Sequence, residues 1–299
     1  MESQIVPYGG WQNNLRLHNA HAELIITLDV GPRIISYRTP DGPNVFKNYE
    51  AGMGGSNEPE WQIRGGHRLW VAPEGEASYA PDNHPVPYEV IPGGVRLRPK
   101  LAGSPPIGRE LTVTLAEDSS RVTLHHRLTN LGNEPVEMAS WALSVMAPGG
   151  LEIIPQPPLG EHPRDLLPTR VLVPWPYTDL GDPRWNFGTR FITLQQQAGG
   201  RPTKLGIAHR EGWVSYLNGG TLFTKTFAYE EGAIYPDFGS NFETYTDTDM
   251  LEIESLSPLR RLAPGESVSH GETWSLREEV PAPGRDDPDA WIARFISLP

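Results

Sequence analysis

Short strand-like segments separated by turn residues recur from residue 22 to residue 276, and this pattern strongly constrains the fold. Residues 109–115 and 121–130 alternate between apolar and polar side chains, and residues 116–120 are a suitable hairpin loop between them. Gly and Pro, 31 of each, are scattered rather than clustered, as in proteins with many strands and tight turns. A short helix is expected over residues 288–295. The sequence therefore predicts an all-β protein with little helix.

We expect one domain over residues 1–299. The strand-like segments recur about every 8 to 12 residues, which is typical of a β-sandwich or barrel. All-β proteins of this length often form a single domain, although the chain is long enough for two. Residues 150–187 are rich in proline and irregular, so we expect a functional insertion there.

Composition excludes several classes of function. The net charge of −12 argues against nucleic acid, whose phosphates need a basic surface, and against an anionic membrane face. The chain has no Cys, so neither disulfides nor thiolate metal sites can form. No apolar run approaches the ~20 residues of a spanning helix, and residues 1–7 lack signal-peptide features. We expect a cytoplasmic monomer or homodimer, and its charge is compatible with a neutral, hydroxyl-bearing ligand.

Residues 249–258 form the most informative segment for function. In an extended strand Leu251 and Ile253 point to one face, while Glu252 and Glu254 point to the other, about 7 Å apart. Two carboxylates backed by an apolar face suit a concave sheet surface that binds and protonates a hydroxyl-rich ligand. The alternative is a surface strand with a solvated acidic face.

Residues 61–74 are the second informative segment, because paired glycines precede His67 and Arg68 and tryptophans lie on both sides. Aromatic rings stack on the apolar face of a sugar, and charged donors form strong hydrogen bonds with its hydroxyls. The alternative is a packed loop in which His67 caps a turn and Arg68 pairs with Glu74.

No metal or cofactor is expected. The histidines do not follow a zinc motif, and His126 shares a strand face with apolar residues, which indicates a core histidine, whereas His125 points outward. One acidic stretch could offer oxygens to calcium, but its spacing differs from that of an EF-hand loop; its members are Asp237, Asn241, Glu243, Asp247 and Asp249.

Several motifs, in order along nearly the whole chain, resemble those of the galactose mutarotase superfamily, which includes the aldose 1-epimerases. The chain more closely resembles a group of bacterial proteins classed as a domain of unknown function. The resemblance implies a β-supersandwich with two large, mostly antiparallel sheets and a sugar on a concave face. The motifs are residues 65–70 with Pro73-Glu74, 128–130, 141–143 with 148–150, 182–185, 235–237, and 251–258 followed by 262–266.

The resemblance also implies roles for individual residues. Glu254 matches the glutamate that takes the proton from the anomeric hydroxyl, although relatives have a proline where this chain has Ser255. His67 and Arg68 resemble a substrate-binding His/Arg motif. The strand that supplies the acid histidine in relatives has none here, at residues 139–143. Either His67 has taken over protonation, or the chain binds sugar without converting it.

The leading hypothesis is a carbohydrate-binding, aldose-epimerase-like protein that interconverts sugar anomers by acid/base ring opening. The alternatives are a non-catalytic sugar-binding or sensor protein and a carbohydrate lyase or hydrolase on the same fold. A phosphate on the sugar would be held by Arg64, Arg68 or Arg184. The expected catalytic residues are Glu254 and His67, and the expected substrate-binding residues are Arg68, Glu252, Glu243, Trp175, Tyr177, Trp185 and Arg184.

Overall fold

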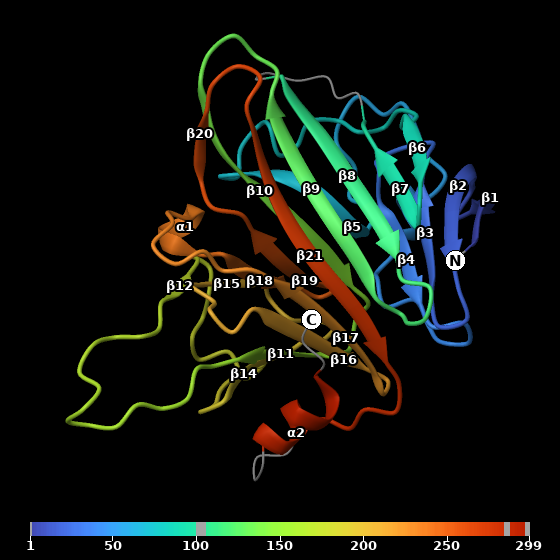
Figure 1. Cartoon of the computed structure of the whole chain (residues 1–299). Coiled ribbons are helices and arrows are strands. Elements are labelled where there is room, and N and C mark those ends of the chain that lie inside the picture. Colours follow the sequence, from blue (N-terminus) through green and yellow to red (C-terminus); the bar gives the residue numbers. More distant parts are fainter. Residues whose placement is uncertain (1, 100–105, 284–287, 297–299) are drawn as a thin grey trace.

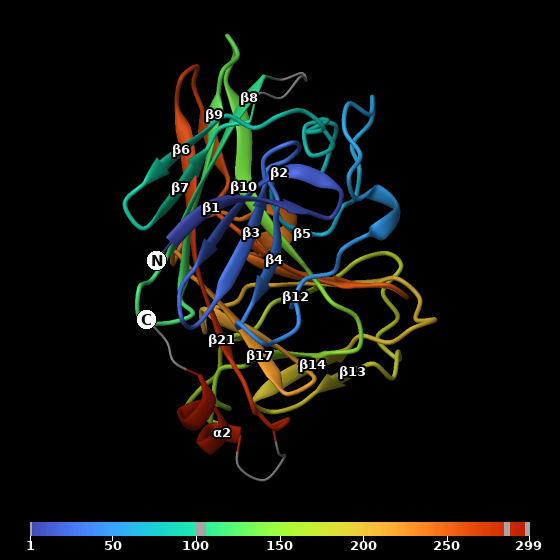
Figure 2. The ribbon, with the colours of Figure 1, turned by 90° about the vertical axis from the view of Figure 1, so that its right-hand side faces the viewer.

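Two large antiparallel sheets form the protein in a computed structural model that describes residues 2–99, 106–283 and 288–296. The first sheet has 11 strands, one of which, β20 (Arg260–Leu262), pairs only with β10. The strands that face the viewer in Figure 2 include β1 to β4. In spatial order the sheet contains β1 (Glu2–Tyr8), β2 (Trp11–His18), β3 (Glu23–Thr27), β4 (Ile34–Arg38), β5 (Gly66–Ala72), β10 (Val136–Met146), β19 (Leu251–Leu256), β18 (Phe242–Thr246), β15 (Thr203–Ile207) and β12 (Leu172–Pro174).

The second sheet has 10 strands, and β9 and β21 lie side by side near its middle (Figure 1). Helix is limited in the described residues to η1 (Glu50–Gly52), the single turn α1 (Pro236–Gly239) and α2 (Pro288–Phe295). The expected short helix and the all-β class are therefore confirmed. In spatial order the sheet contains β13 (Trp185–Phe187), β14 (Phe191–Gln195), β11 (Leu151–Pro155), β16 (Trp213–Asn218), β17 (Thr221–Phe227), β21 (Ser267–Arg277), β9 (Val122–Asn130), β8 (Ile107–Leu115), β7 (Gly94–Leu97) and β6 (Tyr88–Ile91).

The main core lies between the two sheets, as the alternating strands predict. Leu111, Val113 and Leu115 of β8 are buried, and His126 of β9 is buried while His125 is exposed. Aromatic rings from both sheets meet at the centre, where four rings lie 5.5–6.4 Å apart by their centroids: Tyr37, Phe46, Phe223 and Trp274. Burial of this apolar surface is the main driving force for the sandwich.

Residues 150–187 contribute strands to both sheets. The stretch begins with β11, which pairs with β14 and β16, and ends with β13, which also pairs with β14. Between them β12 forms an edge of the first sheet. Residues 156–171 contain neither helix nor strand and project at the lower left of Figure 1. The irregular character that the sequence predicts is thus confined to the middle of this stretch.

A buried ion pair connects the two sheets. The ammonium of Lys225 on β17 lies 2.9 Å from a carboxylate oxygen of Glu272 on β21. It also donates a hydrogen bond to the backbone oxygen of Ile253, on β19 of the first sheet, at 3.1 Å. The other oxygen of Glu272 accepts a hydrogen bond from the indole of Trp274 at 2.9 Å. Both charges are therefore compensated, as buried charges must be.

Three buried histidines, His67, His126 and His270, add further polar groups between the two sheets. Nδ1 of His126 lies 3.3 Å from the backbone oxygen of His270, and therefore carries the proton. Its Nε2 then accepts a hydrogen bond from Nε2 of His67 at 2.8 Å. Nδ1 of His67 in turn accepts one from the hydroxyl of Ser144 at 2.9 Å. In this arrangement the hydrogen bonds of His67 and His126 are made with both imidazole rings neutral.

Burial controls the protonation of these rings. It lowers the pKa of His126 to about 4 and that of His270 to about 3, and it lowers the pKa of His67 well below its usual value. In an unfolded chain the same side chains take up protons near pH ~6.5. Their contribution to stability is therefore complete above that pH and is lost as the pH falls.

No helix in the described part of the chain is long and apolar enough to cross a membrane.

The contribution of these three histidines to the free energy of unfolding should therefore decrease as the pH is lowered from ~6.5 to ~4.5, by at most about 1.4 kcal/mol per pH unit for each of them. The buried carboxyl groups with raised pKa, such as Glu152, act in the opposite direction, so the comparison of wild type with a histidine variant isolates the effect. Urea denaturation at several pH values measures this dependence. His126→Gln keeps a donor and an acceptor but cannot titrate, so its stability should change less with pH. His125→Gln is the matched control, because that side chain is exposed on the same strand. Identical pH dependence in wild type and His126→Gln would contradict this assignment.

Candidate functional site

Strand β19 presents its two carboxylates to the face of the first sheet that is turned away from the second. Leu251 and Ile253 point into the main core. Glu252 and Glu254 lie on the opposite face, where they are only 7% and 0% exposed. The acidic face is therefore covered, and the alternative of a solvated surface strand does not hold.

The strand register brings further charged side chains to this face. Arg68 of β5 and Glu243 of β18 lie in one row with Glu254, because residues directly opposite in antiparallel strands share a face. Lys204 of β15 lies in the next row, with Glu252. We call these five residues the charged cluster. All are buried.

Paired glycines position the start of β5. Gly65 and Gly66 both have positive φ, which glycine adopts readily. A Cβ atom on Gly65 would overlap the backbone oxygen of Lys47, and one on Gly66 would overlap that of Ile34. The two glycines therefore allow the chain to enter the sheet between these segments and place Arg68 on the cluster face.

Lys204 joins two of the carboxylates. Its ammonium lies 2.8 Å from Oε2 of Glu243 and 2.9 Å from Oε2 of Glu254. The indole of Trp141 donates a second hydrogen bond to Oε2 of Glu254 at 2.8 Å. Trp141 lies in the segment 139–143, which has no histidine, and its indole N–H contacts Glu254 without offering a titratable proton.

Arg68 and Glu252 form the second ion pair of the cluster, with 2.9 Å between Nη2 and Oε1. Arg68 therefore pairs across the sheet with Glu252, whereas Glu74 accepts a hydrogen bond from Tyr79. The cluster thus contains two cations and three carboxylates, so it carries an excess of negative charge when all of them are ionised.

Burial and mutual repulsion shift the protonation of the cluster. Burial raises the pKa of Glu243 well above its usual value, and the negative charge of Glu254 adds to this, against the attraction of Lys204. Burial likewise raises the pKa of Glu252, partly offset by Arg68. Burial acts to lower the pKa of Lys204, but Glu254 and Glu243 outweigh it, so the pKa of this ammonium is raised. Lys204 is therefore charged.

Aromatic rings enclose both cations. The guanidinium of Arg68 lies 4.2 Å from the ring centroid of Trp70 and 5.3 Å from that of Trp61. The ammonium of Lys204 lies 4.7 Å from the ring of Trp141 and 4.8 Å from that of Trp175. Cation–π attraction stabilises each contact. These rings also exclude water from the charged cluster.

Several buried polar atoms in this region have no hydrogen-bond partner among the residues that the structure describes. Oε1 of Glu243 and Oε1 of Glu254 are unpaired acceptors. Nε of Arg68 and the indole nitrogens of Trp61 and Trp70 are unpaired donors. Buried polar groups are normally paired, so atoms of this kind require an explanation. A ligand that both donates and accepts hydrogen bonds, as a sugar hydroxyl does, matches both kinds.

The structure does not bring His67 to the charged cluster. His67 pairs in register with Ser144, one position away from Leu143, which lies opposite Arg68 and Glu254. Its side chain therefore points to the opposite face and is fully buried between the sheets, 2.8 Å from His126. The reason is the period of two in a strand, which sends His67 and Arg68 to different faces.

Of the four residues expected from the stretch 150–187, two lie near the cluster. Trp175 packs over Lys204, and Gly206 allows this approach because a Cβ atom there would lie 3.1 Å from the Trp175 ring. Tyr177 is 48% exposed; burial raises its pKa to about 12, and the charges of Lys204 and Glu254 act on its hydroxyl. Both lie at the outer side of the cluster.

The other two residues lie elsewhere. Trp185 belongs to the main core, and its indole donates a hydrogen bond to the hydroxyl of Thr203 at 3.1 Å. Arg184 is paired with Asp182 at 2.6 Å. Both sit at β13 of the second sheet, so the structure does not bring them to the charged cluster.

Sequence reasoning missed Lys204 and Trp141 as members of this region. Lys204 is a lysine inside the otherwise apolar strand β15, between Thr203 and Leu205. That contrast was a usable signal, because a buried lysine normally requires carboxylate partners. Which carboxylates would serve is a matter of strand order, and the sequence does not give it.

A group of metal-ligating residue types gathers between the sheets. Ligand atoms of His67, His126 and Glu272 lie within 4.8 Å of one another. The hydrogen bond between the two imidazoles already uses both Nε2 atoms. The ammonium of Lys225 on Glu272 would repel a cation. We therefore assign this group a structural role.

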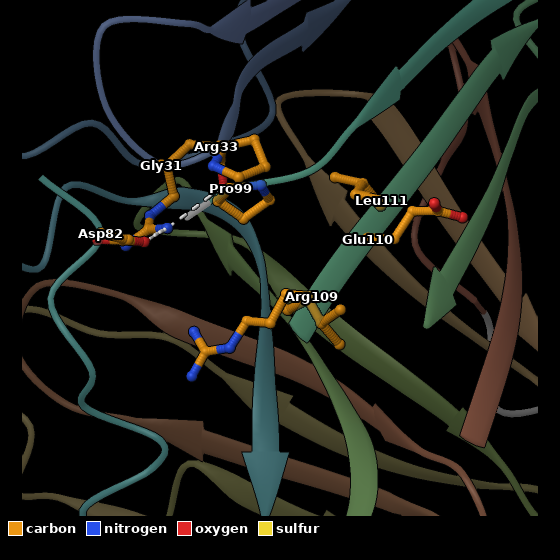
Figure 3. Close-up of a pocket in the computed structure, with 9 residues that line it drawn as sticks. Gly31, Arg33, Asp82, Pro99, Arg109, Glu110 and Leu111 are labelled. Atoms are coloured by element: carbon orange, nitrogen blue, oxygen red, sulfur yellow. Dashed lines mark hydrogen bonds and ion pairs between the residues drawn. The ribbon is translucent and has the colours of Figure 1, made fainter. Parts of the chain in front are cut away.

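A small pocket lies apart from the charged cluster, and Figure 3 shows the ion pair of Arg33 with Asp82 at one side of it and Arg109 extending below. The space open to water is ≈ 20 Å³, enough for about one water molecule and too small for a sugar. It is lined by Gly31, Pro32, Arg33, Leu69, Asp82, Pro99, Arg109, Glu110 and Leu111.

Comparison with solved structures finds similar architectures over most of the chain. A galactose mutarotase-like protein from Lactobacillus casei has a TM-score of 0.57 and 12% identity, with 89% of this chain and 100% of that chain covered. A galactose mutarotase-like protein from Clostridium acetobutylicum has a TM-score of 0.56 and 10% identity, with 93% and 98% covered. A TPR-domain containing protein from Parabacteroides distasonis has a TM-score of 0.59 and 14% identity, with 90% and 47% covered.

No protein-family model and no curated protein matches the chain. At identities of 10–14% the likeness concerns the fold, because sequences this different share architecture without necessarily sharing activity. Two large, mostly antiparallel sheets that face each other agree with the fold expected from the sequence. The chain therefore has the galactose mutarotase-like fold.

Proposed function

We propose that the protein binds a neutral sugar at the charged cluster and interconverts its anomers, with Glu254 as general base. The observation that carries this proposal is the set of buried, unpaired donors and acceptors around Glu254. Oε2 of Glu254 is held by Lys204 and Trp141, which leaves Oε1 free to accept the anomeric proton. The likeness to galactose mutarotase-like proteins supports the same reaction class.

The charge balance favours a neutral sugar over a phosphorylated one. Arg64 is paired with Glu58 at 2.7 Å, Arg68 with Glu252, and Arg184 with Asp182. All three arginines that could have held a phosphate therefore already have a carboxylate partner.

Aromatic side chains supply the remaining elements of a sugar site. Trp61 and Trp70 are in contact, with ring centroids 4.9 Å apart, and Trp175 lies on the other side of the cluster over Lys204. Such rings pack against the apolar face of a pyranose. Because the cluster is buried, entry of a sugar requires this aromatic cover to move. Trp61 and Trp175 are partly buried, and Tyr177 is exposed.

Replacement of Glu254 by Gln should lower the rate of anomer exchange by ~10²–10⁴-fold, because the amide cannot accept the anomeric proton. Polarimetry of freshly dissolved α-glucose or α-galactose measures the rate. Calorimetry should show that sugar binding is largely retained, because the amide keeps the shape of the side chain. Equal rates for wild type, Glu254→Gln and buffer alone would reject catalysis on these sugars, and binding without turnover would favour a sugar sensor.

Arg68→Lys should weaken sugar binding by about tenfold or more, since lysine cannot reproduce the planar donor arrangement of the guanidinium. Arg184→Lys is the matched control: it alters a second arginine–carboxylate pair of similar burial that lies at the other sheet. Calorimetric titration with the same sugar measures both variants, and circular dichroism checks their folding. A similar loss of affinity in both variants would contradict the proposed location of the site.

A further inference from the structure

We propose that Glu243 is the acid of the anomer exchange and donates its proton to the ring oxygen while Glu254 takes the proton of the anomeric hydroxyl. This inference rests on the proposed function and gives the site an acid that does not involve His67. It identifies Glu243 and Glu254 as a pair of carboxyl groups with opposite roles.

The strand register places the two carboxyl groups together. Glu243 and Glu254 lie directly opposite each other on β18 and β19. Side chains in such positions have Cβ atoms about 4.5–5.5 Å apart. Both bind the ammonium of Lys204 through Oε2, and both leave a buried Oε1 without a hydrogen bond. Two free carboxyl oxygens on one sheet face can therefore reach two neighbouring oxygens of one pyranose ring.

Charge compensation requires one of the two carboxyl groups to be protonated. Lys204 supplies one positive charge for two buried carboxylates, and Arg68 is already paired with Glu252. An uncompensated buried charge is costly, so a pair of this kind holds one proton between its members. The cluster is therefore built to carry both an acid and a base.

Hydrogen bonding decides which member holds the proton. Oε2 of Glu254 accepts hydrogen bonds from Lys204 and from Trp141, whereas among the described residues Glu243 is bound through Lys204 alone. Hydrogen bonds donated to a carboxylate favour its ionised form. Glu254 is thus the better base and Glu243 the better acid.

The groups around Glu243 also favour its protonated form. The titratable and charged groups that face it are Lys204 on β15, Glu254 and Glu252 on β19, Asp237 of α1 and Tyr177 after β12. Burial and the negative charges of Glu254 and Asp237 raise the pKa of Glu243, against the attraction of Lys204. Opposite protonation of two adjacent carboxyl groups is the usual basis for acid and base assignments in a catalytic pair.

In the resulting reaction each proton and each electron pair is accounted for. Glu254 removes the proton of the anomeric hydroxyl, a C1–O double bond forms, and the bond between C1 and the ring oxygen breaks. Its electron pair goes to the ring oxygen, which takes the proton of Glu243. After rotation about C1–C2, the ring oxygen attacks the other face of C1 and returns its proton to Glu243, while the new anomeric oxygen takes back the proton held by Glu254. No other reactant is needed.

Two substitutions of Glu243 test this role. Glu243→Gln keeps the size of the side chain but has no transferable acidic proton, so the rate of anomer exchange should fall by ~10²–10⁴-fold while sugar affinity changes little. Glu243→Asp is shorter but remains an acid, so it should retain more activity than Glu243→Gln. A purely structural role predicts the reverse order, because Gln matches the shape of Glu better. Glu89→Gln, on exposed β6, is the control.

The pH dependence of kcat/KM gives a second readout. In wild type the rate should fall at high pH as Glu243 ionises, and in Glu243→Asp this fall should move to lower pH, because Asp is intrinsically the stronger acid. This comparison remains decisive if Glu243→Gln does not fold. A wild type that binds hexoses but does not accelerate anomer exchange overturns the proposed function. An active wild type whose rate and pH profile are unchanged by both substitutions overturns the acid role alone.

Discussion

Both faces of the central strands of the first sheet are buried, and this constraint shapes the rest of the molecule. Every residue of β5 and of β19 is buried. A strand buried on two sides has no solvent to satisfy its polar side chains, so each must find a partner inside the protein. His67 and Ser255 find hydrogen-bond partners on the inner face. On the outer face Arg68 and Glu254 form ion pairs, but each keeps one buried polar atom without a hydrogen bond among the described residues.

Buried charges are compensated differently on the inner and the outer face of the first sheet. On the inner face the ammonium of Lys225 meets the carboxylate of Glu272 beside neutral histidines, and burial raises the pKa of the second carboxyl group there, that of Glu152, well above its usual value. On the outer face three carboxyl groups share two cations, so one carboxyl group has no cation of its own, and carboxyl oxygens remain without a hydrogen bond among the described residues. The inner layer holds the sheets together, whereas the unevenly compensated carboxyl groups of the outer layer are the basis of the proposed site.

Much of the fold was predictable because it depends on local patterns. Alternation along residues 109–115 and 121–130 predicts β8 and β9 and the burial of His126. The same alternation correctly assigns Glu252 and Glu254 to one face of β19 and Leu251 to the other. Local sequence patterns were less informative about the candidate site. They grouped His67 with Arg68 because they are adjacent in sequence, yet adjacent residues of a strand point to opposite faces.

The sequence by itself determined the β-rich architecture, the placement of the acidic pair on one strand face and the negative charge that is compatible with a neutral ligand. Only the tertiary structure decided which side chains meet that pair. Lys204 and Glu243 reach Glu254 because β15, β18 and β19 are neighbours in the sheet, and Arg68 reaches Glu252 from β5 across β10. The physical reason is that strand alternation is set within each segment, whereas strand order is set by packing of the whole chain.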